Sequence, residues 1–262
     1  MPTEPRPFAL NLPSISLSLR VLFTGFLGVI GVGMAMSGLQ IFLTHGMADG
    51  KLGVSKDDIV YSYYGDRSDS RLAAKLAGTM ADKADSADKA TIIKWVEAGS
   101  PRGVWDGSVG AVFAKNCVKC HGTIPGLADF TTYEGVTAYT EIDQGASVSA
   151  LTRVSHIHLF GIAFISFFLC GIFSLSVGLP GWLKAAAIAT PFVFQLVDIS
   201  SWWLTKWYPG FAYMTMVGGF TYNLSAAFMI LTSLYQMWVL PLRGTPTLEN
   251  TWARLQAVPP PD

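Results

Sequence analysis

Four long apolar segments divide the chain, with polar stretches between them. They cover residues 21–44, 154–179, 185–204 and 214–240. Each is long enough to cross a bilayer, which takes about 20 apolar residues in a helix. The first and the last also exceed the usual length of a buried helix in a soluble protein. The pattern therefore predicts an all-α fold with four transmembrane helices.

Two of these segments have further features. The first carries no charge and is too long for the core of a signal peptide, so we expect an uncleaved signal anchor. Its glycines, among them Gly28, Gly31 and Gly38, are the small residues that let helices pack closely in lipid. The third segment is the least apolar, because it contains Gln195 and Asp198.

A polar segment, residues 45–153, lies between the first and second apolar segments. It holds 12 of the Lys and Arg residues and 14 of the Asp and Glu residues, so most of the charge of the chain is here. Helical spacing and capping residues predict short helices over 57–64, 70–82, 87–98 and 108–122. The chain should break between the third and fourth of these at Gly99, Ser100, Pro101 and Gly103. Residues 122–150 have little periodicity and are predicted to form a loop. We therefore expect a small helical domain inserted between transmembrane helices 1 and 2.

The short connections predict the orientation, because Lys and Arg favour the cytoplasmic side. The basic residues of the two tails and of the connection between helices two and three are Arg6, Arg20, Lys184, Arg243 and Arg254. The other short connection holds only Lys206. The tails 1–20 and 241–262 are therefore predicted to be cytoplasmic, and the domain 45–153 to lie outside. Trp202, Trp203, Trp207 and Tyr208 fit an aromatic belt at the outer interface.

Composition supports a membrane protein. Charged residues make up 14% of the chain and hydrophobic residues 51%, whereas soluble domains have about a quarter charged residues. The formal net charge is zero and there is no basic run, so nucleic acid is not an expected partner. The expected partner is the lipid bilayer.

The motif with recognisable chemistry is Cys117-Val-Lys-Cys120-His121. Cys-x-x-Cys-His is the attachment signature of c-type haem. Two thiols one helical turn apart can bond the two vinyl groups of one haem, and His121 then binds the iron. A thioredoxin-like pair would need a βαβ pattern, and a zinc site would need further ligands at metal spacing. Cys170, the remaining cysteine, lies in an apolar helix and is assigned no role.

The segment around this motif resembles class I cytochromes c with its two halves in swapped order. In that family the attachment motif comes first, and a Met ligand and a C-terminal helix follow it. Here Met80, a polar loop and a helix from Ser86 to Trp95 come before the motif, and 109–121 resembles the opening helix. The resemblance covers residues 71–128. It implies a circularly permuted haem domain, one covalent haem c, His121 as the proximal iron ligand and Met80 as the sixth ligand. By this resemblance the chain is identified as a membrane-anchored c-type cytochrome.

Histidines remain alternative ligands. His45 lies at the outer end of the first helix, and His156 and His158 lie at the outer end of the second. Asp198 lies in the same layer, and ionisable residues beside transmembrane segments are usually functional. We expect Asp198 to contact His156 or His158 as a proton-accepting or ring-orienting group. A non-covalent haem b between His45 and one of this pair is a further hypothesis.

These features predict a membrane-bound cytochrome c subunit that passes single electrons within, or to, a larger respiratory or photosynthetic complex. Its partners would be other subunits of that complex, in a bacterial cytoplasmic membrane with the haem domain in the periplasm. Two alternatives stay open: an enzyme subunit that oxidises quinol at the outer-leaflet His/Asp layer, and a structural assembly subunit.

Overall fold

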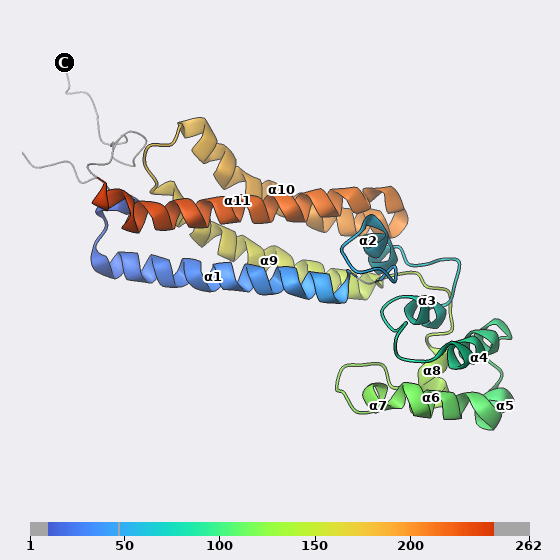
Figure 1. The fold of residues 1–262 in the computed structure, drawn as a ribbon. Coiled ribbons are helices and arrows are strands. Elements are labelled where there is room, and N and C mark those ends of the chain that lie inside the picture. Colours follow the sequence, from blue (N-terminus) through green and yellow to red (C-terminus); the bar gives the residue numbers. More distant parts are fainter. Residues whose placement is uncertain (1–9, 47, 244–262) are drawn as a thin grey trace, which may run out of the picture. The chain divides into compact units, whose positions relative to one another are not determined.

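The structure is a computed structural model that describes residues 10–46 and 48–243, and all of its regular elements are helices (Figure 1). Within these residues the nearest feature to a sheet is a single isolated bridge between Ser70 and Ile142. The predicted all-α fold is confirmed.

Four helices are long and apolar enough to cross a membrane. They are α1 (Leu17–Thr44), α9 (Val148–Ser174), α10 (Gly181–Trp207) and α11 (Ala212–Trp238). The prediction of a multi-pass membrane protein is therefore confirmed. Arg6 and Arg254, which contributed to the predicted orientation, lie outside the described residues.

The helix ends differ from the predicted ones because hydropathy follows apolar residues, which can stop before a helix ends or continue beyond it. α9 begins at Val148 rather than at residue 154, and it ends at Ser174 rather than at residue 179. The hydroxyl of Ser147 accepts a hydrogen bond from the backbone N–H of Ala150, which is how a capping residue starts a helix. α10 is longer than predicted at both ends despite Gln195 and Asp198.

The described chain forms two compact units. The four-helix unit comprises residues 10–38, 153–200 and 214–243, and the small-helix unit comprises residues 39–46, 48–152 and 201–213. The core of the four-helix unit is apolar, with Leu27, Leu169, Phe173 and Met229 fully buried. The glycines of α1 lie on open faces, because a Cβ added at Gly28, Gly31 or Gly38 would meet no other atom within 4 Å.

The small-helix unit contains short helices. They are α2 (Lys56–Tyr63), α3 (Arg71–Ala77), α4 (Ser86–Glu97), α5 (Arg102–Val104), the π-helical segment η2 (Trp105–Val109), α6 (Gly110–Asn116), α7 (Val118–His121) and α8 (Tyr133–Thr137). The helices α2, α3 and α4 each begin after a residue whose side chain accepts from the backbone N–H three residues later; these residues are Ser55, Ser70 and Asp85. The sequence locates these starts well because the caps are local.

Three predictions about this unit were wrong in detail. The helix expected over 70–82 ends at Ala77, where Gly78 leaves the helical conformation. The helix expected to start at residue 108 begins at Arg102, so Gly103 is helical rather than part of a break. The expected loop 122–150 contains α8, which Thr132 caps by accepting from the N–H of Gly135. A five-residue helix is too short to leave an apolar period in the sequence.

The core of the small-helix unit joins α3, α4, η2, α6 and α8 around aromatic rings. Trp95 of α4 and Phe113 of α6 are buried, and their ring centroids lie 6.4 Å apart. Phe130 packs edge-on against Phe113 at 5.8 Å.

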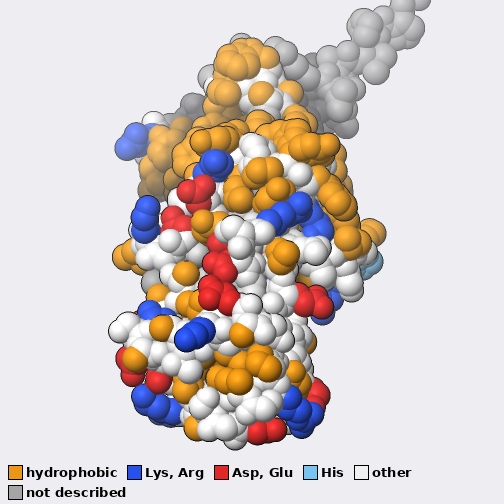
Figure 2. All heavy atoms as spheres, turned by 90° about the vertical axis from the view of Figure 1, so that its right-hand side faces the viewer, with side chains coloured by type: hydrophobic (Ala, Val, Ile, Leu, Met, Phe, Trp, Pro, Cys, Tyr) orange, Lys and Arg blue, Asp and Glu red, His pale blue; other side chains and the backbone are white. Residues whose placement is uncertain are grey.

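On the face that Figure 2 shows, acidic and basic side chains are intermixed rather than gathered by sign.

Candidate haem-attachment site

The two cysteines of the motif lie on one turn of helix. Cys117 precedes α7, and its carbonyl accepts hydrogen bonds from the N–H of Cys120 at 3.1 Å and of His121 at 2.9 Å. Residues three apart on a helix share a face. Both thiols are free, with Cys120 exposed and Cys117 half-buried. This arrangement presents two thiols on one side of α7.

The ring of His121 is held by the loop that follows it. Its Nδ1 lies 3.0 Å from the carbonyl oxygen of Ala128, which can only accept, so Nδ1 carries the proton. The N–H of Phe130 in turn donates to the carbonyl of His121 at 3.2 Å, and the Phe130 ring stacks on the imidazole at 4.3 Å. In the neutral form of the ring, Nε2 is then the nitrogen without a proton. A histidine that binds a metal is oriented in this way, with its other ring nitrogen donating to a carbonyl.

The environment of Cys117 differs from that of a redox-active Cys-x-x-Cys pair. Burial, and to a smaller extent the carboxylate of Asp88, raises the pKa of the Cys117 thiol. Thioredoxin-like pairs need the opposite shift, because the thiolate is the nucleophile. The described residues also form no βαβ unit. Both observations weigh against the thioredoxin-like alternative.

Met80 lies in the turn that joins α3 to α4. Its N–H donates to the carbonyl of Lys75 at 2.8 Å, and Lys89 of α4 donates to the carbonyl of Ala81 at 2.9 Å. The Met80 side chain is half-buried and packs against the same core cluster as Cys117. The structure therefore brings the Met80 turn and the attachment motif to one core.

The start of α4 is tied to the helix that carries the motif. The Asp88 carboxylate accepts from Lys115 Nζ at 2.7 Å and from Asn116 Nδ2 at 2.8 Å. The first of these bonds is the main reason that the pKa of Asp88 lies below its usual value. Together with the ring contact between Trp95 and Phe113, these bonds pair α4 with α6. Two helices that would be the last and the first of an unpermuted cytochrome domain are thus neighbours.

The residues present fit one covalent haem. Cys117 and Cys120 would hold its vinyl groups, His121 would bind the iron through Nε2, and Met80 is placed on the same core. Among the described residues, no three His, Cys, Asp or Glu side chains gather to hold a metal ion. A haem iron needs fewer protein ligands than a free metal ion, because the porphyrin supplies four of its ligands and side chains supply only the axial ones.

His45, one of the alternative ligands, is held by the small-helix unit. Its Nδ1 lies 2.9 Å from Ser62 Oγ, and this hydroxyl donates its proton to the carbonyl of Asp58 at 2.7 Å. Ser62 must then accept from His45, which fixes the proton on Nδ1 and leaves Nε2 unprotonated. Burial and the nearby ammonium of Lys75 lower the pKa of His45, while Asp58 opposes them more weakly. His45 is therefore a neutral base directly after the last residue of α1.

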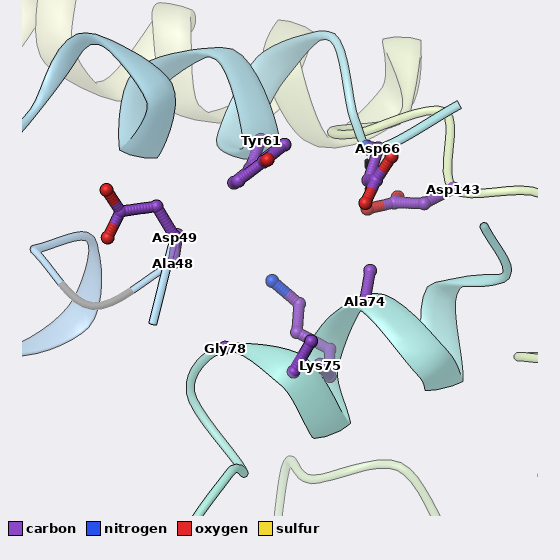
Figure 3. Close-up of a pocket in the computed structure, with 9 residues that line it drawn as sticks. Ala48, Asp49, Tyr61, Asp66, Ala74, Lys75, Gly78 and Asp143 are labelled. Carbon is purple, nitrogen blue, oxygen red and sulfur yellow. Dashed lines mark hydrogen bonds between the residues drawn. The ribbon is translucent and has the colours of Figure 1, made fainter. Parts of the chain in front are cut away.

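The small-helix unit contains a cavity of about 80 Å³ (Figure 3). Its lining begins at Ala48 and Asp49, and it continues with Tyr61 of α2 and Lys75 of α3. The Lys75 side chain points into the space, while the carboxylates of Asp66 and Asp143 lie close together at one side. A polar cavity of this size holds a few water molecules. It is too small for a haem.

In the layer of Asp198, α9 is joined to α10 by an amide for which the sequence predicted no role. Gln195 is buried, and its Nε2 donates to the carbonyls of His158 at 3.0 Å and Leu159 at 2.9 Å. Asp198 lies almost one turn further along α10, and it approaches Gly218 of α11 so closely that a Cβ added at Gly218 would lie 3.0 Å from the Asp198 Cβ and 3.1 Å from its Cα and N. The polar character of Gln195 in an apolar helix was the available signal.

The two histidines of this layer are exposed on α9. His158 Nδ1 donates to the carbonyl of Val154 at 2.9 Å, and the His156 ring lies 5.2 Å from that of Phe160. They belong to the four-helix unit, whereas His121, Met80 and His45 belong to the small-helix unit. A contact of Asp198 with either histidine stays a prediction, as does ligation by either one.

The C-terminal end of α10 is clamped within the small-helix unit. Lys206 is buried, and its Nζ donates to the carbonyls of Gln144 at 3.0 Å and Ala146 at 2.7 Å. Arg67 donates to the carbonyl of Lys206 at 3.0 Å, and so caps the end of the helix. The sequence analysis assigned Lys206 only to a short loop. Every residue has a backbone carbonyl, so a sequence pattern cannot show which carbonyls a lysine will bond.

Comparison with known proteins gives one match. A family model described as a transmembrane helical domain matches residues 130–244, which is less than half of the chain. The match spans α8 to α11 and excludes the Cys-x-x-Cys-His motif. No curated protein and no solved structure matches the chain. The family match agrees with the three apolar helices that it covers, α9, α10 and α11.

Proposed function

We propose that the chain is a membrane-bound c-type cytochrome subunit that passes single electrons within, or to, a larger respiratory or photosynthetic complex. One observation supports this above the others: the Cys117–His121 turn, with the His121 proton held by Ala128 and Nε2 left to bind iron. The haem supplies the one-electron chemistry, and the protein supplies attachment, ligands and burial. The site we propose is Cys117, Cys120, His121 and Met80.

The expected location follows from the same reasoning. The protein would reside in a bacterial cytoplasmic membrane, with the small-helix unit on the periplasmic side, where haem is attached to such motifs. Both termini would be cytoplasmic, as the basic residues Arg20, Lys184 and Arg243 favour.

Covalent attachment is the first test of this function. Acid–acetone extraction of the purified protein should leave haem on the chain, because thioether bonds survive it. Replacing Cys117 and Cys120 by Ala should make the remaining haem extractable, whereas Cys170→Ala, in the membrane segment, should not. Complete extraction of haem from the parent protein would refute the proposal.

A second candidate function is quinol oxidation at the outer leaflet, and the state of His45 favours it. A neutral imidazole with an unprotonated Nε2 can accept a proton from a quinol hydroxyl. Reduction of the purified protein by a quinol analogue without partners would support the enzyme. Reduction that occurs only with co-purifying subunits would support the carrier. A haem inert to both would leave a structural role in assembly.

A further inference from the structure

Two arginines lie at the end of the four-helix unit where α1 begins and α11 ends. Arg20 is in the first turn of α1, and Arg243 follows the short helix η4 (Leu240–Leu242). The short helix η1 (Leu12–Ser14) contacts η4. Arg20 reaches back to this region, because its Nη2 donates to the carbonyl of Pro13 at 2.8 Å and its Nε to that of Ile15 at 3.2 Å.

Each guanidinium group lies over an aromatic ring of α11. The Cζ atom of Arg20 is 5.9 Å from the centroid of Trp238, and that of Arg243 is 5.8 Å from the centroid of Tyr235. Tyr235 and Trp238 are three residues apart, so they occupy neighbouring positions on one helix face. The Trp238 Nε1 also donates to Thr24 of α1 at 2.9 Å, which fixes this ring between the two helices. Cation–π contact holds both charges at one surface.

No carboxylate neutralises these charges among the residues that the structure describes. None of the ion pairs found there includes Arg20 or Arg243. Asp198 is the one acidic residue in the described part of this unit. It lies well along α10, about 25 Å of helix from Gly181, the first residue of α10.

Apolar side chains are exposed beside the two arginines. Leu17 and Val21 of α1 are 68% and 59% exposed, and Leu242, next to Arg243, is 86% exposed. Tyr235 and Trp238 are each 40% exposed. A surface that combines two guanidinium groups without an ion pair among the described residues, interfacial aromatic rings and exposed apolar side chains matches a molecule with an anionic head and hydrocarbon chains.

We propose that Arg20, Tyr235, Trp238 and Arg243 form a binding site for the head group of one anionic phospholipid. Guanidinium groups bind phosphate oxygens in a planar, charge-assisted geometry that an ammonium does not match. The acyl chains lie along the exposed residues of α1 and α11. The basic residues predict that this end faces the cytoplasm, where anionic lipids attract such groups. The site does not depend on the haem.

The test uses the full-length protein purified in mild detergent. Binding of phosphatidylglycerol, cardiolipin and phosphatidylcholine is measured by native mass spectrometry, and the melting temperature is recorded with each lipid and with inorganic phosphate. The anionic lipids should bind and raise the melting temperature, whereas phosphatidylcholine and phosphate should not. Arg243→Gln should weaken anionic lipid binding about fivefold, the size expected for one basic residue at such a surface. Arg20→Gln combined with it should weaken binding further.

Controls separate this site from general charge. Arg153→Gln removes an exposed arginine of the same unit and should leave lipid binding unchanged. Arg20→Lys keeps the charge but should bind less lipid than the parent, because the planar guanidinium is lost. Arg243 is exposed, so its variant remains informative if Arg20 variants fail to fold. Equal stabilisation by phosphatidylcholine or by phosphate, or unaltered binding in Arg243→Gln, would overturn the proposal.

Discussion

The sixth ligand is the prediction on which the haem site can be tested most sharply, through Met80→Leu and Met80→Ala. Leucine nearly conserves the volume of methionine, so Met80→Leu should cost less than about 1.5 kcal/mol in packing. Met80→Ala leaves a gap as well. Because the side chain is only half-buried, its cost should lie at the low end of the 2–5 kcal/mol seen for buried Met→Ala.

The two variants separate ligation from packing. If the Met80 sulfur binds iron, both variants should lose the weak charge-transfer band of Met–His haem at the edge of the near-infrared, although their stabilities differ. If Met80 only fills the core, Met80→Leu should keep the spectrum of the parent and Met80→Ala should lose stability alone. The assay is the absorption spectrum of the oxidised protein, combined with thermal unfolding followed at the Soret band. Met229→Leu, a fully buried Met in the four-helix unit, is the matched control.

An unchanged spectrum in Met80→Leu would refute the ligand assignment. The assignment would then move to His45, His156 or His158. Of these, His45 shares a unit with His121 and has an unprotonated Nε2.

Three further predictions follow from the remaining polar groups. His45 has a lowered pKa, so just below the usual histidine pKa of about 6.5 the folded protein binds fewer protons than the unfolded chain. The free energy of unfolding should therefore fall as the pH drops through that value. The melting temperatures at pH 7.5 and pH 5.5 should differ less in His45→Gln than in the parent protein. Lys206→Met should leave two backbone carbonyls without a donor, and each should cost about 1–3 kcal/mol of stability. Limited proteolysis should then cut residues 143–147 faster than in the exposed control Lys119→Met. An unchanged rate of cleavage would count against the clamp. Asp198→Asn should shift the midpoint potential of the haem or its pH dependence. A titration that overlays the parent at every pH would make this layer a helix anchor and leave the quinol alternative to His45 alone.

Local patterns account for the features that the sequence predicted correctly. The four membrane helices follow from the length of uninterrupted apolar sequence, which has few alternatives in a folded chain. The starts of α2, α3 and α4 follow from Ser55, Ser70 and Asp85, because a cap bonds a backbone N–H only three residues away. The Cys-x-x-Cys-His motif is also local, since one helical turn sets the relation between its thiols.

Contacts between distant residues decided the rest. The sequence placed His121 in the motif, but the proton on its Nδ1 depends on the carbonyl of Ala128, which the intervening loop must bring back to the ring. The tautomer of His45 likewise depends on Ser62, 17 residues away. Lys206 bonds carbonyls 60 and 62 residues earlier in the chain. Backbone carbonyls occur at every residue, so no side-chain pattern announces which of them will bind a cation or an imidazole, and only the tertiary structure could select these partners.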